Sequence, residues 1–88
     1  VAEVVAAYRK FARAYYVRGD EPTKEYVEMR YAARPLLRLF SSLPAESFGP
    51  KALRTVQRQL ESEARLSRRV INRRINRIRR IFKWAVSE

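Results

Sequence analysis

The segment from Ser67 to Glu88 carries eight arginine and lysine residues and one acidic residue, at its last position. Wound at about 100° per residue, as in an α-helix, the segment separates into two faces. One face is apolar and contains Ile71, Ile75, Ile78, Phe82 and Ala85. The opposite face is polar and cationic and contains Arg69, Asn72, Arg73, Asn76, Arg80 and Lys83. Because the apolar stripe of a long helix needs cover from other helices, this segment predicts a helical bundle.

Two helices are predicted before this segment, in the first half of the chain. The first runs from Ala2 to about Val17, ends at the turn from Gly19 to Pro22, and has an apolar stripe of Val4, Tyr8, Phe11 and Tyr15. The second runs from Lys24 to about Ser41, with Thr23 as its N-cap and a stripe of Tyr26, Met29, Ala33, Leu37 and Phe40. Pro35 removes one hydrogen bond inside this pattern, so we expect a proline kink near residues 32–34.

A third helix is predicted to begin at Pro50, after a loop from Leu43 to Gly49 in which Phe48 reaches the core. Its inward residues are Leu53, Val56, Leu60 and Ala64, and Ser67 is the expected N-cap of the fourth helix. No stretch shows the alternation of a strand. The predicted fold class is therefore all-α, a compact four-helix bundle that forms a single domain over residues 1–88. Because the chain starts at valine and stops within a helix, we expect a fragment of a longer protein.

The net charge is +11 and is concentrated in the second half of the chain. Residues 49–88 contain twelve basic and three acidic residues, whereas residues 1–48 contain eight and six. Such an imbalance indicates a polyanionic partner, which leaves nucleic acid, an acidic protein and an anionic membrane surface as candidates. A membrane-surface helix is the weakest of these, because the apolar stripe is needed to close the bundle.

The composition argues against an enzyme. The chain has no cysteine and no histidine, which excludes a disulfide and a thiolate metal site and fits a reducing compartment. No constellation of nucleophile and base, no glycine-rich phosphate loop and no metal-ligand spacing is visible. We therefore predict a non-catalytic fragment with no cofactor and no metal.

The cationic face of the fourth helix is the principal candidate site. A solvated helix normally mixes glutamate with lysine, and here the repulsion is uncorrected. Arginine reads guanine or grips phosphate and asparagine pairs with adenine, so the face predicts DNA binding. Arg74, Arg77 and Arg79 flank the apolar stripe, where they would reach phosphates or lie beside the core. The alternative is a basic interaction module for RNA or an acidic protein.

Two further basic strips are each compatible with a binding surface or with an ordinary solvated surface. Lys51, Arg54, Arg58 and Arg65 share a side of the third helix, and Glu61 at its edge makes an ordinary solvated surface an equal alternative. Lys24, Arg34 and Arg38 form a strip on the second helix beside Tyr31, which gains weight only if the bundle places it next to the fourth helix. Trp84 projects off the apolar stripe toward Arg73 and Arg77, where it would cover a flank of the core or meet another domain.

Several short motifs resemble the core-binding domain of phage-type integrases, which are tyrosine recombinases. They are Phe48-Gly49-Pro50, Leu53, Leu66-Ser67-Arg68, Ile71-Asn72-Arg73-Arg74-Ile75, Arg77-Ile78 and Phe82-Lys83-Trp84-Ala85-Val86, with Arg34-Pro35-Leu36 upstream. The resemblance implies a SAM-like four-helix bundle that clamps double-stranded DNA with its fourth helix in the major groove. The family's catalytic residues belong to a second domain, so the implied partners are DNA and a catalytic domain of the same parent chain.

The resemblance also assigns residues and a setting. The implied parent protein breaks and rejoins DNA, oligomerises on it, acts in the cytoplasm at the nucleoid and has no membrane partner. The implied DNA-binding residues are Arg69, Asn72, Arg73, Asn76, Arg80, Lys83, Arg68, Arg77, Lys24, Arg34 and Arg38.

Overall fold

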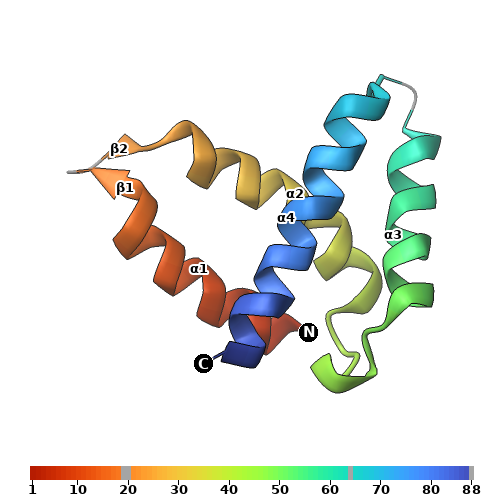
Figure 1. The fold of residues 1–88 in the computed structure, drawn as a ribbon, viewed down its shortest axis with the longest axis horizontal. Coiled ribbons are helices and arrows are strands. Elements are labelled where there is room, and N and C mark those ends of the chain that lie inside the picture. Colours follow the sequence, from red (N-terminus) through yellow and green to blue (C-terminus); the bar gives the residue numbers. More distant parts are fainter. Residues whose placement is uncertain (19–20, 64, 88) are drawn as a thin grey trace.

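The computed structural model describes residues 1–18, 21–63 and 65–87. Its elements are α1 (Ala2–Tyr16), β1 (Val17–Arg18), β2 (Glu21–Pro22), α2 (Lys24–Phe40), the 3-10 helix η1 (Ala45–Ser47), α3 (Pro50–Ser62) and α4 (Arg68–Ser87). The prediction of an all-α protein with four helices is confirmed. Figure 1 shows the four helices in their order along the chain.

Besides the helices, the described residues form one short pair of strands that no alternation in the sequence indicated. β1 and β2 form an antiparallel pair in which Val17 lies opposite Pro22 and Arg18 lies opposite Glu21. Strands of two residues are too short to show a period of two, so the sequence pattern could not reveal them. α1 ends at Tyr16, one residue before the predicted end at Val17, and the predicted capping residue Gly19 lies outside the described residues.

The helix starts follow the expected capping chemistry. The Thr23 hydroxyl accepts a hydrogen bond from the backbone N–H of Tyr26 at 3.4 Å, and the Ser67 hydroxyl accepts one from that of Val70 at 3.2 Å. Pro50 occupies the first turn of α3, where a missing N–H costs nothing. α2 continues without interruption through the buried Pro35, and its ribbon bends in this half of the helix in Figure 1.

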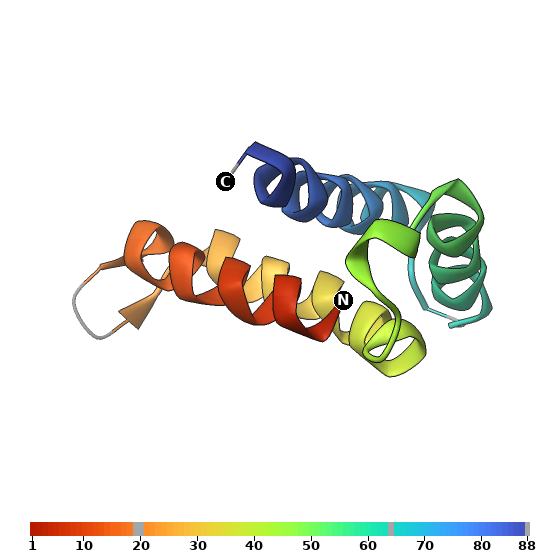
Figure 2. The ribbon, with the colours of Figure 1, turned by 90° about the horizontal axis from the view of Figure 1, so that it is seen from below.

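The helices pack in two layers around a core that α4 closes. Figure 2 shows α1 and α2 side by side in one layer, with α4 lying across them and α3 beside α4. The main core cluster joins Val5, Leu36, Val56, Leu60 and Ile78, and a second cluster is formed by Tyr8, Ala12, Tyr26, Met29 and Ile81. α4 buries Ile71, Ile75, Ile78 and Ile81. This burial turns its opposite face outward.

Aromatic contacts complete the core, and the exposure of one tyrosine corrects a prediction. Phe48 stacks on Phe82 with ring centroids 4.4 Å apart, so the loop does reach the core as predicted. Tyr15 is 69% exposed, so its predicted place in the core is wrong. Trp84 covers a flank of the core, which is one of the two roles that the sequence left open. Its ring lies 5.3 Å from those of both Tyr8 and Phe11, because α1 packs against this end of α4.

Candidate nucleic-acid interface

The outer face of α4 is a continuous cationic surface, here called the α4 crest. It consists of Arg69, Asn72, Arg73, Asn76, Arg80 and Lys83, all exposed. No aspartate or glutamate occurs between Arg68 and Ser87. Beside the crest, Arg79 donates a hydrogen bond to the amide oxygen of Asn76 at 3.3 Å. The structure therefore gathers these six predicted residues on one exposed face of α4.

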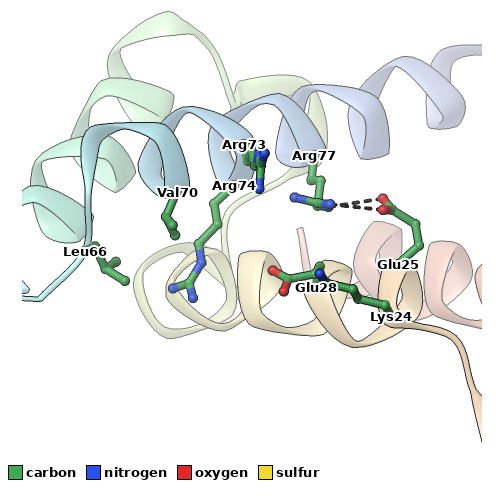
Figure 3. A pocket seen from close by; sticks show the side chains of 8 residues that line it. All are labelled: Lys24, Glu25, Glu28, Leu66, Val70, Arg73, Arg74 and Arg77. Atoms are coloured by element: carbon green, nitrogen blue, oxygen red, sulfur yellow. Dashed lines mark hydrogen bonds and ion pairs between the residues drawn. The ribbon is translucent and has the colours of Figure 1, made fainter.

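A cleft between α2 and α4 adjoins the α4 crest. Its volume is about 610 Å³ and it is lined by Lys24, Glu25, Glu28, Leu66, Val70, Arg73, Arg74 and Arg77. Figure 3 shows Arg74 extending across the cleft toward α2, and Arg77 directed at Glu25. The cleft brings Lys24 of the second basic strip next to the fourth helix, which is the condition that the sequence left open.

Glu25 joins the two walls of this cleft through two arginines. Its carboxylate accepts hydrogen bonds from Arg77 Nε at 3.1 Å and Arg77 Nη2 at 3.0 Å, and one from Arg80 Nη1 at 3.2 Å. The side chain of Arg77 is 16% exposed, whereas that of Arg80 is 55% exposed. Two of the predicted DNA-binding residues are thus engaged by a carboxylate of the domain itself, and Arg77 is the more enclosed of the two.

The ion pairs change the acidity of Glu25. The hydrogen bond from Arg77, supported by the charges of Arg77 and Arg80, lowers the pKa of Glu25 below 4.5 against the opposing effect of partial burial. Because this pKa is lower in the folded state than in the unfolded chain, the contribution of Glu25 to stability is present above about pH 4.5. The contribution is lost as the pH falls through the folded-state pKa.

We therefore expect the stabilising effect of Glu25 to depend on pH. In urea unfolding, Glu25→Gln should lower the free energy of unfolding at pH 7, and this loss should shrink as the pH falls below 4.5 through the lowered folded-state pKa of Glu25. Glu28→Gln is the control, because Glu28 lines the same cleft and makes no ion pair within the described residues. A loss for Glu25→Gln that does not change with pH would contradict the expectation.

Tyr31 connects the basic strip of α2 to α4. The guanidinium carbon of Arg34 lies 5.0 Å from the centre of the Tyr31 ring, and that of Arg74 lies 5.6 Å from it. Cations over an aromatic face are attracted by its quadrupole, so Tyr31 holds two arginines from different helices near one point. Arg38 is exposed in the last turn of α2, and no hydrogen bond or ion pair within the described residues links it to α4.

The side of α4 that faces α3 is less uniformly cationic. A second cleft of about 360 Å³ is lined by Gln57, Glu61, Arg68, Ile71 and Asn72. Arg68 and Asn72 therefore lie near the carboxylate-bearing side of α3. The basic residues Lys51, Arg54, Arg58 and Arg65 are exposed, and both interpretations of that strip stay open.

Sequence reasoning missed the partner of Arg77 and Arg80. Glu25 lies more than fifty positions away from both, and nothing in the local sequence pattern links it to the fourth helix. The described residues contain no group of three or more histidine, cysteine, aspartate or glutamate residues that could hold a metal ion. Within the same residues, every helix is too short or too polar to cross a bilayer.

Comparisons with protein-family models, with curated proteins and with solved structures found no match. The resemblance to the core-binding domain of tyrosine recombinases accordingly stays a prediction from the sequence.

Proposed function

We propose that this domain binds duplex DNA through the α4 crest. The observation that carries the proposal is a twenty-residue helix whose apolar stripe is buried and whose opposite face is exposed and free of acidic residues. The crest from Arg69 to Lys83 is about 21 Å long at 1.5 Å per residue. This length corresponds to about six base pairs at 3.4 Å each, which a helix in the major groove can follow.

The proposed contacts with DNA fall into two groups, those with phosphates and those with bases. Arg69, Arg73 and Lys83 stand on the crest, with Arg68, Lys24 and Arg34 at its margins, and these six cations are suited to phosphates. Asn72 and Asn76 are the candidates for contacts to base edges. Arg77 is assigned a structural role and not a contact with DNA, since it donates two hydrogen bonds to the Glu25 carboxylate. With no reacting group in this set, the proposed role is binding within a larger recombinase, whose catalytic domain would break and rejoin the DNA strands.

The binding should depend steeply on salt. If about six phosphates are neutralised, the logarithm of the association constant should fall with the logarithm of salt concentration at a slope near −5. Fluorescence anisotropy with a labelled DNA duplex between 50 and 200 mM salt measures this slope, and the affinity should drop about 1,000-fold over that range. A flat dependence would count decisively against the proposal.

The same assay separates DNA from the alternative partners. The major groove of A-form RNA is too narrow for a helix, so an RNA duplex of equal length should compete poorly with DNA. If the RNA duplex binds more tightly than DNA, or if neither duplex binds, the result would instead favour the basic interaction module.

A further inference from the structure

The engagement of Arg80 by Glu25 bears on how the α4 crest meets a phosphate backbone. Arg80 lies one turn beyond Asn76 on the crest, yet it turns to the side to reach the first turn of α2. It makes a single hydrogen bond to Glu25 and keeps more than half of its side chain exposed. Arg77 makes two hydrogen bonds to the same carboxylate from a mostly enclosed position. The carboxylate therefore keeps a bidentate partner if Arg80 leaves.

We propose that Glu25 is a specificity-determining residue that competes with DNA phosphate for Arg80. The inference rests on the proposed function. In the unbound domain Glu25 neutralises Arg80, and a phosphate withdraws this arginine while Arg77 keeps Glu25 in place. The exchange replaces one charged hydrogen bond with another, so Arg80 contributes less to binding than an arginine with no internal partner. A partner with little negative charge cannot replace Glu25 as the hydrogen-bond acceptor of Arg80. Such partners are therefore bound less well than DNA.

Removing the competitor should strengthen binding. Glu25→Gln is expected to raise the affinity for a 12-base-pair DNA duplex about tenfold, which is the effect of about 1.4 kcal/mol. Glu28→Gln removes the same charge from the same cleft without releasing an arginine, and it should raise the affinity only about twofold through the general field. Equal effects of the two substitutions, or weaker binding by Glu25→Gln, would overturn the proposal.

A double-mutant cycle isolates the pair. Arg80→Ala should reduce DNA affinity several-fold more in the Glu25→Gln background than in the wild type, since Arg80 acts in full only when its competitor is absent. Identical losses in the two backgrounds would overturn the proposal. Circular dichroism of each variant checks that the fold is retained.

Nuclear magnetic resonance tests the exchange in the wild-type protein, where no variant has to fold. The Nε–H signal of Arg80 should shift on titration with sodium pyrophosphate or with the duplex, while that of Arg77 should move much less. An unmoved Arg80 signal, or equal movement of both signals, overturns the competition. If the wild type binds no DNA in the anisotropy assay, the proposed function fails, and the pyrophosphate titration still decides whether a phosphate displaces Glu25.

Discussion

Replacing Ile78 with alanine is expected to lower the free energy of unfolding by about 3 kcal/mol, which is typical for truncating a fully buried isoleucine. Ile78 is 0% exposed and lies in the cluster that joins α4 to α1, α2 and α3. The substitution removes apolar contacts and leaves a cavity that the surrounding helices fill only in part. For a domain of this size the melting temperature should fall by about 12–24 °C. Thermal unfolding followed by circular dichroism measures this change.

Val86→Ala is the matched control for this prediction, because Val86 is an apolar residue of the same helix and is 89% exposed. It should change the free energy of unfolding by less than about 0.5 kcal/mol. A similar loss for both substitutions would mean that burial of the apolar stripe does not account for the loss at Ile78, since alanine favours a helix at either position. A negligible loss for Ile78→Ala would show that α4 does not close the core.

The sequence predicted the helices well because each one combines a clear period with local boundary signals. Thr23, Pro50 and Ser67 mark helix starts through chemistry that acts within a few residues. The exposed face of α4 was predictable for the same reason, since a helix that buries Ile71, Ile75 and Ile78 has to turn Arg69 and Asn76 outward.

The errors arose where the burial of a side chain depends on the position of another helix. Helical spacing places Tyr15 on the stripe of Tyr8 and Phe11, but α1 extends past its cover and leaves Tyr15 exposed. Ile81 was not assigned to the stripe, yet it is fully buried because α1 widens the contact at this end of α4. Trp84 takes its position from the same contact. Periodicity within one helix says nothing about the width or extent of the surface that covers it.

In the candidate site, too, features of a single helix were predictable and contacts between helices were not. The α4 crest follows from one helix and was predictable, whereas the ion pairs of Glu25 depend on the placement of the α2 N-terminus and were not. Glu25 also lies in the first turn of α2, where the helix dipole favours an acidic residue. One carboxylate therefore stabilises the start of α2, fixes α4 through Arg77 and reduces the charge of the crest at Arg80.

The double substitution Arg69→Glu and Arg73→Glu should reduce the affinity for duplex DNA by at least about 100-fold at 0.1 M salt. Two charge-assisted contacts to phosphate are lost, each contributing at least about 1.5 kcal/mol, and two carboxylates then face the backbone. Both residues are exposed on the α4 crest, so the fold should be retained. Anisotropy measures the affinity, and circular dichroism confirms the helical content.

The matched control is Arg9→Glu with Arg13→Glu, which makes the same change in net charge at two exposed arginines four residues apart on α1. Arg9 and Arg13 line a pocket with Ala6, Lys10 and Tyr26, to which no residue of α4 is assigned, so they belong to another surface than the α4 crest. The control should weaken binding by less than about tenfold, because screening over about 10 Å at this salt removes most of a distant charge's effect. Comparable losses in the two variants would mean that DNA responds to the total charge of the domain, and the α4 crest would then have no special role. A loss confined to the α4 variant requires that the helix which closes the core with one face also presents the binding surface with the other.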